Sequence, residues 1–312
     1  MDKIIQLNIA ADNIRIPSAA MVEKAQSGHP DSILPVGKKI FGLTAGLSVI
    51  LEWLVGCNAR ILIFWTAIAI SGTLPAQTPA KDRPIGGLLQ FKNVHLWRGQ
   101  EVTDEATFAT DIYYTNKKQN LRIGLWGGAG MSGKFKEIDY YVSYKLKGFT
   151  FALWDIYNFS PEADYNNRQV FNYNARKTGH FIDLSITCRF QQKIPLKIYW
   201  ATILFGRDRG ILNDKNRYST FVELSYPVVR NNIVNLDFGI AGAFALNKGN
   251  NVRGNKTESH FYGDSPGIVS VNFIIFKTLD LWGYKLPISV TPVWNPEKNY
   301  ANIQLALNFI SL

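Results

Sequence analysis

The sequence is poor in cysteine, histidine and charge, and each shortage argues against a class of protein. Two cysteines, Cys57 and Cys188, are too few for a disulfide framework or a cysteine-based zinc site. Four histidines without a repeated spacing give no metal site either. Charged residues make up only 19% of the 312, and the longest basic runs are pairs such as Lys117-Lys118, which is atypical of a nucleic-acid binder.

The sequence is instead rich in aromatic residues and in alternation. Aromatics reach 13%, and the mean hydropathy is −0.06, as expected of strands that alternate apolar and polar residues. The clearest segment is Glu137–Lys147, where Ile138, Tyr140, Val142 and two further apolar residues alternate with mostly polar ones. One face of such a strand suits lipid and the other suits water.

About twelve segments of this kind follow one another between Gly86 and Leu312. Each has roughly the 9 to 11 residues that a tilted strand needs to cross hydrocarbon, and an even count is typical of bacterial barrels. The pattern predicts an all-β fold, an antiparallel up-and-down transmembrane β-barrel of the bacterial outer membrane. The expected strands lie near 86–98, 106–115, 121–130, 136–147, 149–159, 180–190, 195–206, 218–228, 231–246, 267–277, 284–293 and 300–310.

The connections between these segments give an independent indication. Outer-membrane barrels have short turns at one end and longer loops at the other. The three longest gaps, Ser160–Gly179, Arg207–Arg217 and Asn247–Pro266, all join an odd-numbered strand to the next even one. A soluble barrel has no reason to sort its loops in this way, so the membrane barrel is favoured.

The chain before the barrel is predicted to contain two further parts, residues 1–37 and 38–77, with the barrel domain at 78–312. The segment Ile9–Pro30 has helical periodicity and resembles the N-terminus of transketolases, in which the histidine matching His29 lines the thiamine diphosphate site. Asp31 stands where that family usually has glycine, and no Gly-Asp-Gly segment follows. The resemblance therefore implies a fragment without activity, and no cofactor is expected.

Residues 38–77 contain two hydrophobic stretches typical of targeting segments. Ile40–Val55 ends just before Cys57, at a lipoprotein-like spacing, although Glu52 interrupts it. Arg60 precedes a second apolar run that ends in small residues, and cleavage after Ala76 would leave Gln77 as the mature N-terminus. The second run is shorter than the roughly 20 residues of a spanning helix. A signal peptide and export are therefore predicted over a buried core helix.

Several of the predicted strands also carry a family resemblance. The features are an Arg98-Gly99 turn closing the first strand, the Gly-x-Trp-Gly of Gly124–Gly127, and acidic Glu137 opening the strand after it. Together with Ala109–Tyr114, they resemble the TorF-type putative porins and related Bacteroidetes outer-membrane proteins, over about Phe91 to Tyr157. This resemblance implies a passive outer-membrane channel.

The basic excess lies in the predicted barrel. Residues 1–77 carry six basic and five acidic side chains, so 34 − 6 = 28 basic and 24 − 5 = 19 acidic residues, a charge of +9, remain for the rest. This excess fits either a lumen that favours anions or loops facing an anionic lipid surface. Charge facing lipid is costly. Ten charged residues are therefore predicted to face the lumen: Arg122, Glu137, Asp139, Lys145, Asp155, Asp183, Arg189, Lys197, Glu223 and Asp237.

No pattern indicates catalysis. The sequence His-x-Ser, which would bring both side chains to one strand face as in outer-membrane phospholipases, does not occur, and neither Gly127–Gly130 nor Gly206–Gly210 continues as a phosphate loop. We therefore expect no enzyme, no catalytic residue, no metal and no cofactor. The predicted function is passive passage of small hydrophilic solutes. A structural or ligand-binding barrel with a plugged lumen is the alternative, and a barrel enzyme is third. Lipid and a small solute are the expected partners, nucleic acid is not, and the oligomeric state is open.

Overall fold

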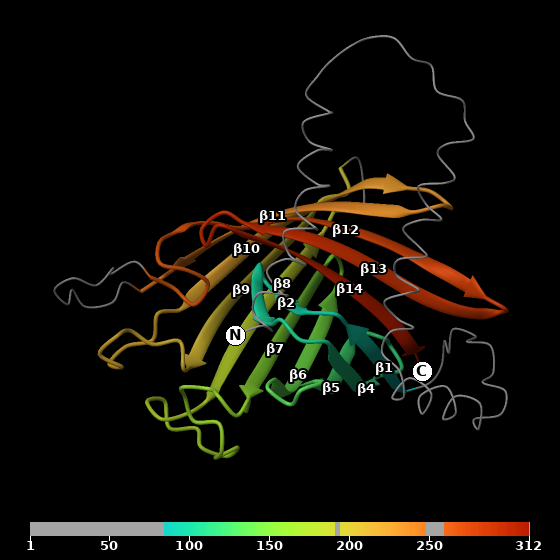
Figure 1. Ribbon diagram of the computed structural model, residues 1–312. Helices are drawn as coiled ribbons and strands as arrows, with labels where there is room; N and C mark the ends of the chain where they lie inside the picture. Colours follow the sequence, from blue (N-terminus) through green and yellow to red (C-terminus); the bar gives the residue numbers. More distant parts are fainter. Residues whose placement is uncertain (1–83, 191–193, 248–258, 312) are drawn as a thin grey trace, which may run out of the picture. The chain divides into compact units, whose positions relative to one another are not determined.

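The computed structural model describes residues 84–190, 194–247 and 259–311, which form a single closed β-barrel (Figure 1). Twelve strands follow one another around the ring in the order β1-β14-β13-β12-β11-β10-β9-β8-β7-β6-β5-β4. The predicted all-β fold with twelve antiparallel strands is confirmed. The interpretations of residues 1–77, including the fragment with His29 and the cleavage site at Ala76 and Gln77, lie outside the described residues.

The barrel strands differ from the expected segments mainly at their ends. Their bounds are β1 (Ile85–Lys92), β4 (Thr107–Thr115), β5 (Leu121–Gly130), β6 (Lys136–Leu146), β7 (Phe149–Asn158), β8 (His180–Arg189), β9 (Lys197–Gly206), β10 (Ser219–Arg230), β11 (Asn235–Ala245), β12 (Gly267–Leu281), β13 (Tyr284–Asn295) and β14 (Tyr300–Ser311). The late start of β11 has a local cause. The side-chain Oδ1 of Asn231 accepts hydrogen bonds from the backbone N–H groups of Ile233 and Val234, which fixes a turn there.

β1 closes the ring because it pairs on both sides. Gln90 lies opposite Ala109 of β4 and opposite Asn308 of β14. In the described part of the chain the wall therefore has no unpaired edge. Closure of this kind is the way in which β-structure satisfies its backbone inside hydrocarbon, where no water is available.

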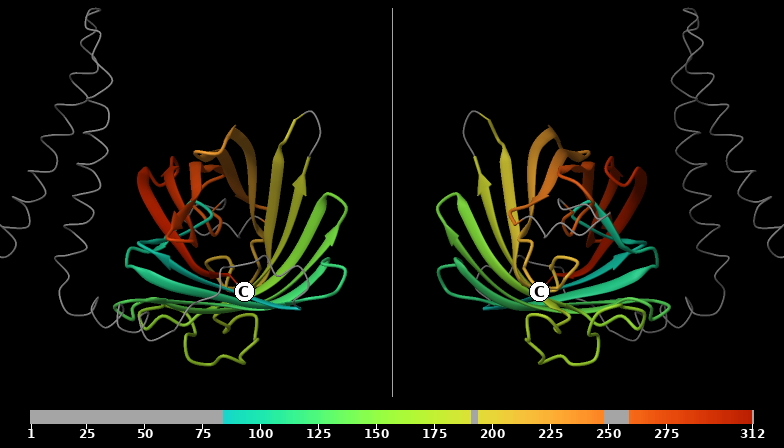
Figure 2. Two further views of the ribbon diagram at one scale, coloured as in Figure 1. Left: turned by 90° about the vertical axis from the view of Figure 1, so that its right-hand side faces the viewer. Right: turned by 90° about the vertical axis from the view of Figure 1, so that its left-hand side faces the viewer.

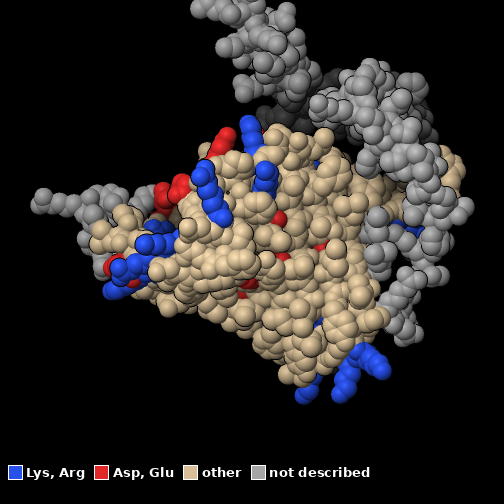
Figure 3. Space-filling model, turned by 90° about the horizontal axis from the view of Figure 1, so that it is seen from below, with Lys and Arg blue, Asp and Glu red and all other residues tan. Residues whose placement is uncertain are grey.

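The outside of this wall is apolar. Along β6, the alternate residues Tyr140, Val142 and Tyr144 are 37%, 39% and 44% exposed, whereas Asp139 and Tyr141, in the other phase of the strand, are buried. Figure 3 shows a face that is almost free of charged side chains, with Lys and Arg gathered at its margins. A soluble protein would bury such a band. An apolar band around a closed ring fits hydrocarbon, so the barrel lies in the bacterial outer membrane.

None of the described residues forms a helix long and apolar enough to cross a membrane.

The first predicted strand, 86–98, is wrong at its end. β1 stops at Lys92, and the chain then forms a separate hairpin of β2 (His95–Trp97) and β3 (Gln100–Thr103). Its two-residue turn is Arg98-Gly99, whose φ angles of 50° and 77° are both left-handed, as in a type I′ hairpin. Only Asn93 and Val94 separate β1 from β2, so alternation alone cannot tell the two strands apart.

Candidate functional site

The hairpin of residues 93–106 folds into the lumen, which the strands surround (Figures 1 and 2). The carbonyl oxygen of Gly99 accepts hydrogen bonds from Asn295 Nδ2 of β13 at 2.9 Å and from the Tyr300 hydroxyl of β14 at 2.6 Å. The backbone N–H of Leu96 donates to Gln304 Oε1 of β14 at 2.9 Å. The hairpin also contacts β8 and β9. Only a segment inside the ring can reach partners on these strands and on β13 and β14 at once.

Arg98, at the tip of the hairpin, makes the strongest of these contacts. Its Nη1 and Nη2 atoms lie 2.8 and 2.5 Å from the two carboxylate oxygens of Asp183 on β8. Nη1 also donates to the hydroxyl of Tyr262, and Nη2 to that of Tyr199, both at 2.7 Å. The side chains of Arg98 and Asp183 are 7% and 0% exposed. A bidentate, desolvated pair of this kind fixes both position and orientation, so the hairpin is held in one place.

Aromatic side chains also pack against the hairpin and help to hold it in place. The Trp97 ring lies 5.9 Å from Phe181 of β8, and 6.0 and 5.7 Å from Phe261 and Tyr262, measured between ring centroids. Phe261 and Tyr262 belong to the connection between β11 and β12. The hairpin therefore packs between the barrel wall and the connection between β11 and β12.

Gly99 is the residue at which this fit is tightest. A Cβ atom there would lie 2.2 Å from the carbonyl oxygen of Val269, and the backbone already has a φ of 77°. Replacing Gly99 with alanine is therefore expected to destabilise the barrel by about 1–3 kcal/mol through strain and overlap. The midpoint of guanidinium unfolding in detergent micelles measures this loss. Gly133→Ala is the control, because its added Cβ meets nothing within 4 Å although its φ of 81° is similarly strained. An equal loss in both variants would contradict the packing account.

His260 organises the connection that carries Phe261 and Tyr262. Its Nε2 lies 2.9 Å from the carbonyl oxygen of Ser265, and its Nδ1 accepts a hydrogen bond from the backbone N–H of Tyr262 at 3.2 Å. One nitrogen donates and the other accepts, which is the arrangement of a neutral imidazole. Burial lowers the pKa of His260 below its ordinary value, which favours the same neutral form.

Acid is therefore expected to weaken this connection. A lowered pKa in the folded state means that the unfolded chain binds the proton more readily, so the stability from neutral His260 is present above the ordinary pKa of about 6.5 and is lost as the pH falls below it. Between about pH 7.5 and about pH 5, the wild type should lose more stability than the His260→Gln variant. Guanidinium titration of both proteins at the two pH values tests this. Identical losses would contradict it.

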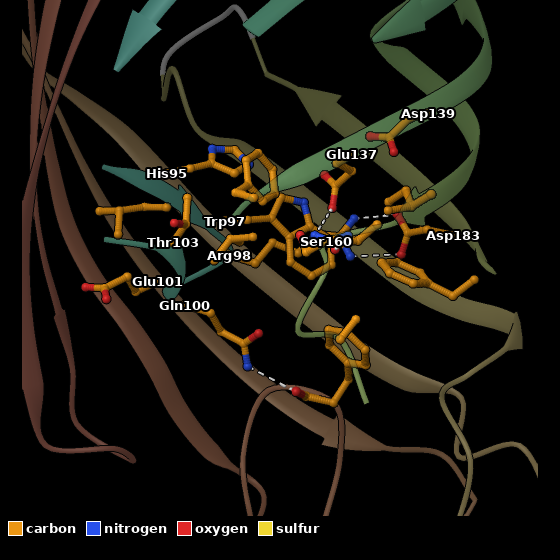
Figure 4. Close-up of a pocket in the computed structure, with 18 of the residues that line it drawn as sticks. His95, Trp97, Arg98, Gln100, Glu101, Thr103, Glu137, Asp139, Ser160 and Asp183 are labelled. Carbon is orange, nitrogen blue, oxygen red and sulfur yellow. Dashed lines mark hydrogen bonds and ion pairs between the residues drawn. The ribbon is translucent and has the colours of Figure 1, made fainter. Parts of the chain in front are cut away.

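A cavity of about 940 Å³ remains between the hairpin and the wall (Figure 4). It reaches from β5 to β9 and up to the connection between β7 and β8. Its described lining contains four basic and six acidic residues: Lys92, Arg98, Lys134 and Arg207, against Glu101, Asp104, Glu137, Asp139, Glu162 and Asp183. The balance of 4 − 6 = −2 is opposite in sign to the charge of the whole chain. The charge of this cavity therefore does not support the interpretation that the lumen favours anions.

Most of the residues predicted to face the lumen lie on that side of the wall. Glu137, Asp139 and Asp183 line the cavity, and Figure 4 shows them on the wall beside the hairpin. Arg122 shares a face of β5 with the cavity residue Trp126, and its guanidinium lies 3.7 Å from the ring centroid of Tyr113. The alternation of β5, β6 and β8 thus places these four charged residues on the inner face.

The remaining predicted residues lie away from the cavity. Lys197 and Glu223 form an ion pair at 3.1 Å between β9 and β10, and Asp237 pairs with Arg230. All three share the strand face of residues that pack inside the barrel: Tyr199, Phe221 and Ala241. Lys145 and Arg189 are exposed near the ends of β6 and β8. The structure therefore does not gather the ten predicted residues into one site.

Asp155 is a correction, because it lies on the outer face of β7. Its neighbours Trp154 and Ile156 line the cavity, so Asp155 points the other way, in phase with exposed Leu153. Outside the barrel it accepts hydrogen bonds from the Tyr173 hydroxyl at 2.5 Å and from His180 Nδ1 at 2.7 Å. The connection between β7 and β8 folds back over the outer wall and supplies Tyr173. Pairing removes the cost of a lone carboxylate on that face, which is the cost that the prediction relied on.

Sequence reasoning also missed the other parts of the site. The sequence correctly indicates a turn at Arg98 but not its ion pair with Asp183, and it assigns no role to Trp97, Phe261 and Tyr262. Asp139, in contrast, was placed on the lumen side by alternation alone. Among the residues that the structure describes, no three His, Cys, Asp or Glu side chains gather as possible metal ligands.

Comparison with known proteins gives no family. No family model matches the chain, and no curated protein matches it. An outer-membrane channel from Pseudomonas putida F1 is 13% identical with a TM-score of 0.37, over 76% of this chain and 95% of that one. Wzi, an Escherichia coli outer-membrane protein of capsule assembly described as a carbohydrate-binding barrel, is 10% identical with a TM-score of 0.31, over 73% and 56%. OpdK, an outer-membrane protein of Pseudomonas aeruginosa, is 9% identical with a TM-score of 0.27, over 70% and 61%.

Scores this low carry no argument about the chain. The fold rests on the barrel's own strand pairing, and the resemblance to TorF-type porins stays a prediction.

Proposed function

We propose that the chain forms a passive outer-membrane channel for small hydrophilic solutes, narrowed by the hairpin of residues 93–106. The observation that carries this proposal is the cavity of about 940 Å³ beside the hairpin, inside the barrel and lined by ten charged side chains. A barrel with a purely structural role would be expected to fill this space with its own side chains and leave no cavity. Charged groups facing a cavity are instead typical of a path for solutes that carry their own hydrogen-bonding groups.

A ligand-binding barrel with a plugged lumen is the second candidate. The bidentate pair between Arg98 and Asp183 favours it, because a hairpin fastened so firmly would leave the barrel slowly. The two candidates share the cavity as their binding site and differ only in whether solute passes the hairpin. Neither assigns a catalytic residue or a cofactor, and we propose that the protein is not an enzyme.

Conductance across a planar lipid bilayer separates the two functions. The full-length wild type is expected to give small, discrete conductance steps. A variant in which residues 94–105 are replaced by a short Gly-Ser turn is expected to give steps severalfold larger, because a wider lumen carries more ions. Lys285→Ala, which removes an exposed charge beside the turn between β12 and β13, away from the connections of the hairpin, is the control and should conduct like the wild type.

Steps in the shortened variant but none in the wild type would support the plugged barrel instead. If neither protein conducts although both have folded into the bilayer, the channel proposal is wrong.

A further inference from the structure

We infer that the cavity contains a subsite for an organic cation, meaning a small solute with a protonated amine, centred on Asp139 and Glu137 of β6. This inference rests on the proposed function, since it names the class of solute that the lumen would admit or hold. Four features support it: a buried carboxylate oxygen without a partner, a second carboxylate beside it, basic neighbours that are engaged elsewhere, and an aromatic wall.

The first feature is the environment of Asp139. In the register of the sheet it lies opposite Trp126 on β5 and opposite Ile156 on β7. The residue is only 6% exposed, and its Oδ1 atom is buried without a hydrogen-bond partner among the described residues. Leaving a buried acceptor unsatisfied is costly, and more so for a charged group. Because Asp139 lines the cavity, a bound donor could satisfy this oxygen.

The second feature is a neighbouring carboxylate on the same strand face. Glu137 also lines the cavity, two residues before Asp139, which separates their Cα atoms by about 7 Å. Its Oε2 accepts a hydrogen bond from Asn158 Nδ2 at 3.1 Å, and that contact orients the group. An ammonium group has three donors and no acceptor. It can therefore satisfy one carboxylate directly and gain charge attraction from the other.

The third feature is that the nearby basic side chains are directed elsewhere. Lys92 Nζ contacts His95 Nδ1 at 3.1 Å and lies 5.8 Å from the centre of the Trp126 ring. The guanidinium of Arg207 stacks over Tyr165 and Phe181, at 4.1 and 4.8 Å from their ring centroids. Among the described residues neither base forms an ion pair within 4.0 Å of the two carboxylates. Lys92 and Arg207 attract Glu137, and Arg207 attracts Asp139, through charge without direct contact, so the carboxylate oxygens stay available to a donor in the cavity.

The fourth feature is the aromatic wall beside the carboxylates. Trp126 lies directly across from Asp139, and Trp154 lines the same cavity from β7. An ammonium or alkylammonium group is attracted to the face of an indole ring, and its carbon chain packs against the same surface. A carboxylate or phosphate solute would instead meet two like charges. An organic cation therefore fits both the carboxylates and the indole rings, whereas an anionic solute does not.

The entry to the cavity carries charges of both signs. Asp104 and Glu162 lie in the connections at that end of the barrel and belong to the lining, as do Lys134 and Arg207. The preference for a cation therefore rests on the two carboxylates of β6. The volume of about 940 Å³ is ample for a small solute, since binding pockets commonly have about 300–1,000 Å³.

Calorimetric titration of the full chain in detergent micelles tests the subsite directly. The probes are butylammonium, butyrate and 1-butanol, which have similar carbon chains and differ in charge. We expect butylammonium to bind and the other two not to bind measurably. Asp139→Asn should weaken butylammonium binding about tenfold or more, because a charge-assisted hydrogen bond to a buried group is lost. Glu137→Gln should weaken it by a smaller factor and provides a second variant.

Asp111→Asn is the matched control. This substitution makes the same chemical change at another residue of the lumen face. The Asp111 carboxylate accepts hydrogen bonds from the Tyr141 hydroxyl, and Asp111 does not belong to the cavity lining. Its butylammonium affinity should stay within about twofold of the wild type. Heat-dependent mobility on gels shows that each variant has folded as a barrel.

The inference is overturned if butyrate binds as well as butylammonium, or if both Asp139→Asn and Glu137→Gln leave the affinity unchanged. The proposed function fails separately. Butylammonium binding without conductance would reject the channel and keep the subsite, whereas conductance without butylammonium binding would keep the channel and reject the subsite.

Discussion

Replacing Arg98 with alanine is expected to destabilise the folded barrel by about 3–5 kcal/mol. The substitution leaves the carboxylate of Asp183, which is 0% exposed, without its counter-ion, and a lone buried charge carries a cost of this size. It also removes the hydrogen bonds to Tyr199 and Tyr262. The hairpin should then detach from β8 and β9. Equilibrium unfolding by guanidinium in lipid vesicles measures the change in stability.

Two further variants give this prediction its control. The double variant Arg98→Ala/Asp183→Ala should be destabilised less than Arg98→Ala alone, because no unpaired charge remains. Lys285→Ala breaks an ion pair whose partners are both more than half exposed, and should leave the stability close to that of the wild type because solvent screens such a pair. If Arg98→Ala were as stable as Lys285→Ala, the hairpin would not be held as the structure shows.

A lysine introduced on the outer face of β7 is expected to cost about 2–4 kcal/mol, whereas a lysine at the next residue on the inner face should cost much less. Leu153, which is 41% exposed near the middle of the strand, lies opposite Val142 and Leu184 on the outer face. Ala152 lies opposite Ser143 and Ser185 on the inner face. Leu153→Lys and Ala152→Lys therefore compare the same charge in lipid and in the lumen.

The free energy of unfolding in lipid vesicles is again the measurement. A lysine at residue 152 can extend into water inside the lumen and should cost less than about 1 kcal/mol. Equal losses at the two residues, or a larger loss at residue 152, would mean that the outer face does not meet hydrocarbon.

The wall of the barrel could be predicted from the sequence because each strand carries its own local pattern. In β6, the exposed residues Tyr140, Val142 and Tyr144 alternate with lumen-side residues, and the environment on each side of the sheet is uniform. Nothing beyond the strand itself was needed to recognise it. The same reasoning predicts a lumen-facing Asp139, and in the structure Asp139 lines the cavity.

The hairpin could not be predicted in this way, because what holds it is remote in sequence. Arg98 and Asp183 are 85 residues apart, and Gly99 and Tyr300 are 201 apart. Alternation continues almost without interruption from β1 into β2, so the local pattern describes one longer strand. The cavity cannot be predicted from the sequence pattern either, because its size depends on where the hairpin folds rather than on any strand alone.

Asp155 shows a different limit of the same reasoning. It shares a strand face with Phe149, Phe151 and Leu153, so strict alternation places it outside, but the cost of a charge in lipid argued for the lumen. The structure resolves the conflict by folding the next connection over the outer wall, where Tyr173 donates to the carboxylate. The contact between β7 and the connection that follows it removes the cost of placing a charge on the outer wall, which the prediction treated as bare.

Nitroxide spin labels along β6 test the central claim most directly. Single cysteines at residues 140–145, in a background with Cys57 and Cys188 replaced by serine, are labelled after folding into lipid vesicles. Labels at residues 140, 142 and 144 should collide mainly with oxygen, which concentrates in hydrocarbon, and labels at 141, 143 and 145 mainly with a water-soluble nickel chelate. This period of two follows from an apolar outer face and a wet lumen. Accessibility to the chelate at all six residues would contradict a membrane-spanning barrel.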